Sequence, residues 1–316
     1  MKNLIAVGIK WLLLFLVVWR TSLFSQAVLP PEKISPIFKW QIGEDLVYKV
    51  KWSFLTIGTL RFRVVEKTEL NGIPVYRCRL HIDSNPDLLF LNIHDLYESY
   101  IGEDMFSYAF ESWERRSDHV LYTRYQMDYQ QMKMHIFMQQ WFPQDTVTVV
   151  DSVVTLHRKV QEGISIFYYA RAMVKHQGRV VLPVWAYFKF SNARMNLHGK
   201  ARSVKVRGEK VQGYYLDGNL KFVGIAGLRE GFKGWFSPDS QSVPLKAYLK
   251  AFIGNVKVEI ERWRGWDASK VFQKPENVQV PWQEVPVASE QYLPYTRKGL
   301  QNWFFRPAIK PGIGND

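Results

Sequence analysis

The chain has 316 residues, of which 47% are hydrophobic and 15% aromatic, and its formal net charge is +13. This content allows a sizeable core in one all-β domain or two smaller ones, and the many aromatic residues favour strands over a helical bundle. The single cysteine, Cys78, excludes an intramolecular disulfide and a cysteine-rich zinc site, and its apolar neighbours predict a buried, inert thiol.

Residues 1–27 have the three parts of a secretory signal peptide. Two lysines provide the positive n-region, residues 11–19 the apolar core, and Ser25-Gln26-Ala27 a small-x-small cleavage site. The apolar core is too short to span a bilayer comfortably. We therefore expect cleavage after Ala27, a short leader over 28–37, and an exported, periplasmic or envelope-associated protein that is not membrane-integral.

Three antiparallel strands are predicted at the start of the domain, within 46–54, 60–64 and 76–82. Hydrophobic and basic residues alternate in them, as expected of half-buried strands. Thr56-Ile57-Gly58 predicts the first turn, and Asn71-Gly72 predicts a type I′ hairpin turn, which needs positive φ at both central residues. One face of these strands is basic and carries Lys49, Lys51, Arg61, Arg63, Arg77 and Arg79.

Further strand-like runs continue almost to the end of the chain. They predict an all-β, mainly antiparallel fold, either a strongly curved sheet or an open barrel or half-barrel, over residues 38–264. A proline- and aromatic-rich extension, 265–316, is expected to pack on or beside this domain. The runs are 97–101, 106–114, 120–129, 132–139, 146–154, 180–190, 201–206, 213–220, 245–252 and 256–263.

One helix is predicted in the middle of the strands, over residues 162–174. Its apolar residues recur at helical spacing on most sides, which indicates a buried helix that plugs or covers the curved sheet. Ser165 is the expected N-cap, and Gly178 marks the stop. Ser165 and Arg171 are interpreted as structural anchors, with the Arg171 guanidinium meeting a carboxylate at the rim of the sheet.

Several segments, in this order along the chain, resemble a family of exported bacterial proteins known as domain of unknown function 3108. They are Ile42–Val50, Thr56–Leu60, Glu162–Arg171, Gly234–Asp239 and Val243-Pro244. The resemblance covers residues 38–264 and implies a curved antiparallel sheet or open barrel in the cell envelope. It departs from the family pattern before the helix, where Glu162-Gly163 replaces the usual Asp. It carries over no catalytic residues.

No catalytic, metal or cofactor motif is recognisable in the sequence. The seven histidines include no pair at the i, i+4 spacing of a helical metal site, and the adjacent pairs His94-Asp95 and Asp118-His119 would point to opposite faces of a strand. We expect no catalytic residues, no metal, no cofactor and no nucleic-acid partner. An envelope-polymer hydrolase nevertheless stays open as an alternative.

The apolar face of the first strands and the helix predicts a candidate binding site. Its residues could line a concavity suited to a lipid-like or amphipathic ligand, or simply fill a core. The leading hypothesis is a non-enzymatic binder or carrier of such a ligand. The alternative is an envelope scaffold whose basic face holds an anionic component; the basic face could also be merely solvated, with Glu66 and Asp83 nearby. The lining candidates are Tyr48, Trp52, Phe54, Phe62, Tyr76, Phe167, Tyr168 and Tyr169.

Overall fold

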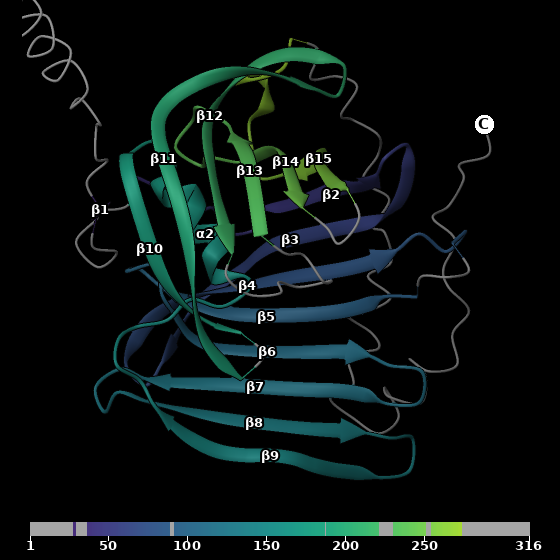
Figure 1. Ribbon diagram of the computed structural model, residues 1–316, viewed down its shortest axis with the longest axis vertical. Coiled ribbons are helices and arrows are strands. Elements are labelled where there is room, and N and C mark those ends of the chain that lie inside the picture. The colour runs from purple at the N-terminus through teal and green to yellow at the C-terminus, as the bar shows by residue number, and fades with distance from the viewer. Residues whose placement is uncertain are drawn as a thin grey trace, which may run out of the picture.

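The computed structural model describes residues 28–29, 37–88, 92–186, 188–220, 230–250 and 254–273. The predicted signal peptide and residues 274–316 of the predicted extension lie outside these residues. The described chain forms a single curved sheet with one α-helix, which confirms the predicted fold class (Figure 1). No helix within the described ranges is long and apolar enough to cross a membrane.

The first half of the sheet is a meander of eight strands. Each pairs antiparallel with the next, so the sheet grows outward from β2 to the terminal strand β9 (Figure 1). These strands are β2 (Asp45–Trp52), β3 (Leu55–Leu70), β4 (Ile73–Ser84), β5 (His94–Gly102), β6 (Ser107–Arg115), β7 (Val120–Asp128), β8 (Lys133–Trp141) and β9 (Thr146–Thr155).

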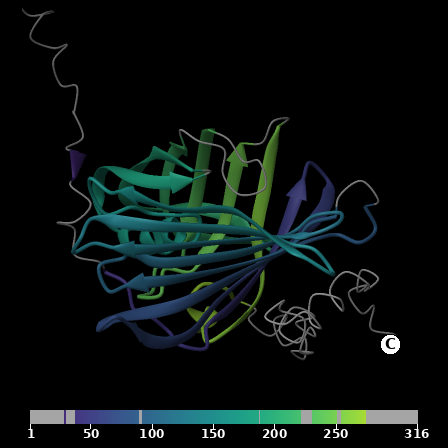
Figure 2. The same ribbon diagram turned by 90° about the horizontal axis from the view of Figure 1, so that it is seen from below.

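The second half is a meander of six strands that returns to the beginning of the first. Its last strand pairs antiparallel with β2, and the short strand β1 (Val28–Leu29) adds to β10 in parallel. Seen from below, the two halves face each other across an interior (Figure 2). The strands are β10 (Gln177–Ala186), β11 (Lys189–Val206), β12 (Glu209–Leu220), β13 (Glu230–Phe236), β14 (Pro244–Lys250) and β15 (Asn255–Arg264).

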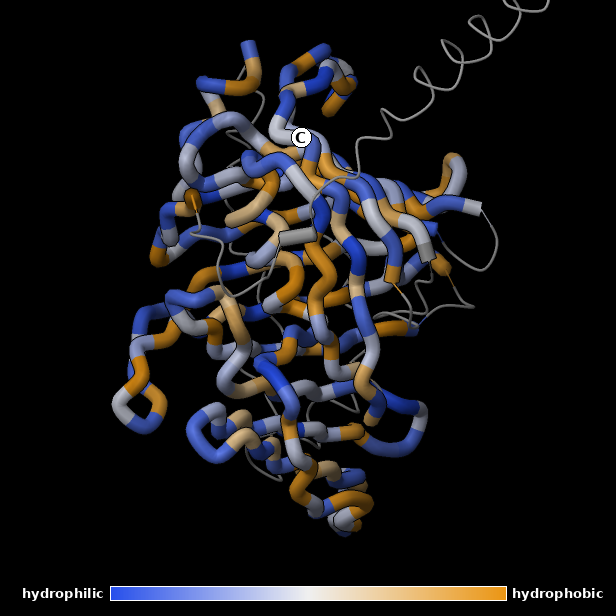
Figure 3. The backbone as a smooth tube through the Cα atoms, turned by 60° about the vertical axis from the view of Figure 1, so that its left-hand side comes forward, coloured by the Kyte–Doolittle hydropathy of each residue, from blue (hydrophilic) through white to orange (hydrophobic). Residues whose placement is uncertain are grey.

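The helix α2 (Ser165–Met173) lies between the two halves, as predicted for a plug. Phe167 stacks on Phe62 of β3 with ring centroids 3.9 Å apart. Tyr169 belongs to a second apolar cluster that includes Val180 of β10 and Met195 of β11. The helix therefore joins the cores of both half-sheets, and Figure 3 shows hydrophobic residues alternating with hydrophilic ones along the strands around it.

Local signals placed most strands correctly and some turns wrongly. Asn71 and Gly72 have φ of 51° and 81°, as the hairpin prediction requires. The turn expected at Thr56–Gly58 lies instead at Ser53, where φ is 55°, and Gly58 sits within β3. A Cβ on Gly58 would come 2.3 Å from the Asp83 carbonyl oxygen, so this glycine serves close strand packing rather than a turn.

The first residues of the predicted extension belong to the folded domain. A short 3₁₀ helix, η3 (Ala268–Lys270), follows β15, and Trp266, Ala268 and Phe272 are buried in the main apolar cluster. The Phe272 ring stacks on Trp263 at 5.5 Å. The domain core therefore continues past residue 264 to at least Phe272.

Candidate binding cavity

The amino end of α2 is held by one buried carboxylate. Glu162 Oε1 accepts hydrogen bonds from Ser99 Oγ at 2.6 Å and from the Ser165 amide at 2.9 Å, and Oε2 accepts one from the Ile164 amide at 2.8 Å. Burial raises the pKa of this carboxyl, and the hydrogen bonds offset part of that effect. The predicted Ser165 N-cap is wrong in detail: Ile164 occupies the cap position, and Glu162 satisfies the amides because a carboxylate is the stronger acceptor.

The carboxyl half of α2 is held by a buried ion pair. Both terminal nitrogens of Arg171 bond Glu44 at 2.7 Å, and the two side chains are 0% and 1% exposed. The Gln241 carbonyl accepts a further bond at 2.9 Å. Burial alone would lower the pKa of Arg171, but Glu44 raises it. The carboxylate expected for Arg171 is therefore Glu44, immediately before β2. The helix ends at Met173, ahead of the expected Gly178 stop, which lies in β10.

Between α2 and the half-sheets lies an apolar cavity of about 580 Å³. Gly163, Ile166 and Phe167 of the helix segment line one part of it. Its volume falls in the range of about 300–1,000 Å³ that is usual for small-molecule sites. The main wall residues are apolar or aromatic: Tyr48, Val50, Leu60, Phe62, Leu80, Ile82, Tyr97, Phe110, Tyr125, Trp185, Val256 and Val258.

Polar side chains line the cavity near one edge of the sheet. We call this part of the cavity the rim; it comprises Ser84 of β4, Glu114 of β6 and Arg116 after β6, with Asp95 of β5 beside Glu114 but not among the lining residues. Asp95 pairs with Glu114 in the sheet and shares a face with Tyr97, two residues on, which lines the cavity. The rim therefore lies at the edge of the sheet where β4 ends, β5 begins and β6 ends.

At the rim, Glu114 has a basic partner for its charge within the described part of the chain and Asp95 does not. Glu114 forms an ion pair with Arg116, and Asp95 accepts hydrogen bonds from the Arg115 amide at 2.9 Å and from Tyr97 OH at 3.2 Å. Burial and the neighbouring Glu114 charge raise the pKa of Asp95 to about 6. Asp95 is thus a partly buried acid whose charge lacks a matching cation of its own among the described residues.

Two buried hydrogen-bond donors line the cavity and have no partner among the described residues: Tyr48 OH and Trp185 Nε1. Tyr48 is 2% exposed and Trp185 is 4% exposed. Burial raises the pKa of the Tyr48 phenol, so it stays a neutral donor. Buried donors are normally satisfied, and these two mark positions where a bound molecule could supply an acceptor.

Of the eight predicted lining residues, the structure places Tyr48, Phe62 and Phe167 on the cavity. Tyr76 and Tyr168 instead pack on Trp40, at 4.3 and 5.1 Å, and Tyr169 faces the second cluster.

The other two predicted lining residues, Trp52 and Phe54, lie at the β2–β3 turn. They are 37% and 90% exposed. Phe54 was placed wrongly because β2 ends at Trp52, so the alternation that put it inside stops two residues earlier.

The sequence analysis also missed the cavity-lining residues that come from strands later in the chain. Tyr97, Phe110 and Tyr125 come from β5, β6 and β7, and Trp185 comes from β10. Each occupies an inward position of an alternating run, which was a usable signal. Pairing between β15 and β2, which brings Val256 and Val258 to the site, had no local signal.

Five of the six residues of the predicted basic face form ion pairs with acids. Arg61 and Arg63 meet Asp45 at 2.6 and 3.4 Å, Arg77 meets Glu66 at 3.2 Å, and Arg79 meets Glu98 at 2.5 Å within the sheet. Lys49 pairs with Glu261, and Lys51 lines a shallow groove of about 300 Å³ beside it. Asp83 bonds His94 rather than this face. The face is therefore an ion-pair network, as required to offset like charges on neighbouring strands.

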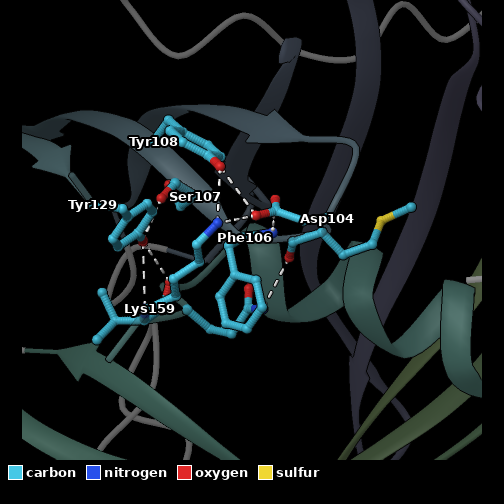
Figure 4. Close-up of polar contacts among 9 residues, drawn as sticks. Asp104, Phe106, Ser107, Tyr108, Tyr129 and Lys159 are labelled. Carbon is cyan, nitrogen blue, oxygen red and sulfur yellow. Dashed lines mark hydrogen bonds and ion pairs between the residues drawn. The ribbon is translucent and has the colours of Figure 1, made fainter. Parts of the chain in front are cut away.

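The segment between β9 and α2 is fixed by a lysine among aromatic rings (Figure 4). Lys159 Nζ contacts Asp104 Oδ2 at 2.5 Å and Tyr108 OH at 3.1 Å, and it lies 5.1 Å from the centre of the Tyr129 ring. Partial burial alone would lower the pKa of Lys159, but its hydrogen bonds to Asp104 and Tyr108 raise it. The protonated amine of Lys159 cannot act as a nucleophile, so we interpret this cluster as a structural anchor for the segment between β9 and α2.

The segment that Lys159 anchors also pairs with strand β10. The amide of Gln161 donates to the Pro183 carbonyl at 2.8 Å, and the Trp185 amide donates to the Gln161 carbonyl at 2.9 Å. The connecting segment thereby pairs with β10 beside the cavity wall. It positions both Trp185 and Glu162 at the site.

Histidines and the cysteine stay apart from the cavity. His94 bonds Asp83 at 2.9 Å rather than its neighbour Asp95, and Asp118 and His119, which lie in a turn, contact each other at 2.8 Å. No group of three or more His, Cys, Asp or Glu residues in the described part of the chain could hold a metal ion. Cys78 is buried, and burial raises the pKa of its thiol, which agrees with an inert side chain.

Comparison with known proteins identifies a family. A family profile described as "Protein of unknown function (DUF3108)" matches residues 47–261. No curated protein matches the sequence.

Three solved structures resemble the fold. One is a β-barrel-like protein of domain of unknown function DUF1849 from Brucella abortus, with 8% identity and a TM-score of 0.46, covering 72% of this chain and 99% of that one. Another, from Bacteroides fragilis, is thought to be exported and has a YmcC-like fold, with 7% identity, a TM-score of 0.32 and coverage of 73% and 100%. The third, from Parabacteroides distasonis, is thought to be a lipoprotein, with 8% identity, a TM-score of 0.31 and coverage of 73% and 100%.

Proposed function

Because the chain belongs to the DUF3108 family, whose function is unknown, we propose its role from its own geometry: an exported protein that binds or carries a lipid-like or amphipathic molecule without catalysis. The observation that carries this proposal is the apolar cavity of about 580 Å³, lined by the α2 segment and by the half-sheets, with a few polar side chains among its lining. The signal-peptide-like residues 1–27 support export.

The cavity chemistry favours a ligand with a long apolar part. Most of its lining is aliphatic or aromatic, and Glu162, the acid that lines it beside α2, already accepts three hydrogen bonds. Transferring apolar surface into such a site contributes about 25 cal/mol per Å². Polar groups at the rim would remain in contact with water, so an amphiphile would satisfy both ends.

The scaffold alternative has less support from the described residues. The four arginines of its proposed contact, the basic face, form internal ion pairs with Asp45, Glu66 and Glu98. An anionic partner would have to displace these acids, which lie on the same strands or their neighbours. The predicted aromatic extension that would hold such a partner lies outside the described residues.

A cavity-filling substitution tests the binding role. Thr123 is 4% exposed and lines the cavity, so Thr123→Trp should fill part of it and reduce binding of the dye N-phenylnaphthylamine by about tenfold or more. Fluorescence titration measures this. Val153→Trp on the exposed face of β9 is the matched control and should bind the dye as the unmodified protein does.

Native mass spectrometry with lipid extraction provides a second readout. Protein purified from its own envelope should carry an amphiphile that is lost from Thr123→Trp and kept by Val153→Trp. Equal dye binding by the two variants, with no extractable amphiphile in either, would contradict the proposed function.

A further inference from the structure

One hairpin tip on the surface exposes aromatic side chains to solvent. The turn between β2 and β3 carries Trp52 and Phe54, which are 37% and 90% exposed. This turn lies at the margin of the molecule, where the purple ribbon turns back at the right in Figure 1. A single exposed ring is ordinary on a protein surface, but two at one turn beside cations mark a contact site.

A cationic groove begins directly beside this tip. Lys51, the residue before Trp52, lies opposite Lys257 of β15 in the sheet. Like charges on directly opposite residues destabilise strand pairing unless an anion offsets them. Both lysines line the groove of about 300 Å³, in which cations outnumber acids. The charged residues of the groove are Lys49, Lys51, Arg207, Lys257, Glu259 and Glu261.

The two acids of the groove do not balance its lysines. Glu259 pairs with Lys246 at 3.0 Å and reaches Lys257 only at 3.9 Å. Glu261 is committed to a different lysine of the groove. Lys51 has no ion pair with any other residue that the structure describes. The groove therefore keeps a positive charge of the sign that attracts anionic lipid headgroups.

The tip also borders the apolar cavity. Val50 and Ile57, which flank the turn on β2 and β3, line that cavity. Val256 of β15, which lies opposite Trp52, lines it too. A bilayer held at the tip would therefore lie next to the cavity, although docking does not depend on what the cavity binds.

We propose that the β2–β3 tip and the groove beside it dock this protein on an anionic lipid bilayer. Trp52 and Phe54 enter the headgroup region, and Lys51 and Lys257 contact lipid phosphates, which is how aromatic and basic residues divide a membrane interface. Each basic residue near such a surface favours binding about fivefold. Two rings and two lysines are few contacts, so the attachment is reversible and weakens with salt.

Vesicle sedimentation tests the docking. Protein purified from its own envelope should bind vesicles of phosphatidylcholine and phosphatidylglycerol in equal parts about tenfold or more tightly than vesicles of phosphatidylcholine alone. Phe54→Ser should weaken this binding about tenfold, because the ring no longer leaves water. Val153→Ser removes an apolar side chain that is 61% exposed on β9, and it is the matched control.

A charge variant separates this surface from the general attraction of a basic protein to an anionic membrane. Lys51→Gln/Lys257→Gln should weaken binding to the anionic vesicles about tenfold or more. Lys133→Gln/Lys200→Gln removes two exposed lysines from β8 and β11 and should not weaken it to this extent. None of the substituted side chains is buried, so melting temperatures should stay close to that of the unmodified protein.

A fluorophore at the tip shows which face meets the lipid. Cys78 is buried, so a thiol-reactive dye labels Ser53→Cys selectively. Lipid that carries a doxyl group should quench this dye in the anionic vesicles. A dye at Ser152→Cys, an exposed position on β9, should stay unquenched.

Three results overturn the inference. They are binding that Phe54→Ser and Lys51→Gln/Lys257→Gln weaken no more than their controls do, an unquenched tip dye on vesicle-bound protein, and the absence of vesicle binding. A photo-crosslinker at Ser53 that captures a protein or a glycan in the envelope, with no lipid, assigns the tip to that partner and also overturns it. Phe54→Ser should bind N-phenylnaphthylamine as the unmodified protein does, so docking and the carrier function can fail separately.

Discussion

Arg171 illustrates how one buried residue can define the position of an element. It joins α2 to Glu44 at the start of β2 and to Gln241 between β13 and β14, and its guanidinium lies 4.9 Å from the Phe38 ring. These partners are far apart in sequence. The ion pair therefore fixes where the helix sits between the half-sheets.

Arg171→Ala should destabilise the fold by about 3–5 kcal/mol, because it leaves the Glu44 carboxylate buried without its cation. Denaturant unfolding measures the change. Lys67→Ala, which removes an exposed pair with Glu103, is the control and should cost at most about 1 kcal/mol. The double variant Glu44→Leu/Arg171→Met should recover part of the loss. A single variant as stable as Lys67→Ala would show that the pair is not an anchor.

Asp95 should make stability depend on pH near the rim. Burial and Glu114 raise its pKa from 3.8 to about 6, while Tyr97, Arg116 and the Arg115 amide oppose that rise, and the facing residue on β4 is the apolar Ile82. A raised carboxyl pKa means that the folded state holds the proton more tightly than the unfolded chain. Its contribution to stability is therefore present below about pH 4 and is lost as the pH rises through about 6.

Asp95→Asn should remove this dependence. Above pH 6 the variant should gain up to roughly 2–3 kcal/mol relative to the unmodified protein, and below pH 4 the two should converge. Urea unfolding across this pH range, with Asp151→Asn as the control, measures the difference. A constant gap between the two proteins at all pH values would be evidence against the assignment.

At the scale of elements, β9 is the least protected part of the sheet. It is the terminal strand, ten residues long, and nearly all of its residues are exposed. Val147, Val149 and Val153 are 44%, 48% and 61% exposed, and Asp151 is its only charged residue. An exposed, β-branched edge strand is a template for pairing with another chain. The opposite edge, at β10, is covered by β1 and by Gln161.

Val153→Lys should reduce self-association at high protein concentration and change the free energy of unfolding by no more than about 0.5 kcal/mol. Sedimentation velocity measures association. Phe54→Lys is the matched control, since Phe54 is 90% exposed at a turn and not at a strand edge. If both substitutions reduced association equally, exposed apolar area rather than the strand edge would be responsible.

At the scale of the whole molecule, local sequence patterns predicted which face of each strand or helix is buried, but not which elements pair with one another. Alternation identified β2–β9 and β15, and the helical spacing identified α2, because burial on one side imposes these periods. β13 was missed, since Gly231 and Gly234 interrupt its pattern. The run predicted over 180–190 crosses the turn at Phe188 that separates β10 from β11, and residues 191–200 of β11 were not predicted.

The site was partly predictable for the same reason. Tyr48, Phe62 and Phe167 follow from the period of their own elements, whereas Phe54 depended on where β2 ends. The positions of the rim and of Trp185 depend on which strands lie side by side, and this is fixed by pairings between distant segments. No local pattern encodes such pairings, and the Glu44–Arg171 ion pair likewise joins residues that the sequence keeps apart.

The pairing of β15 with β2 has a consequence for how the protein forms. Trp52 lies opposite Val256, so the wall that holds Tyr48, Val256 and Val258 closes only after nearly the whole domain has been synthesised. Such long-range pairing is slow because the chain loses loop entropy before the contact stabilises it. A chain that is still emerging from a ribosome or an export channel therefore has no finished cavity, and ligand loading must follow the arrival of the last strand.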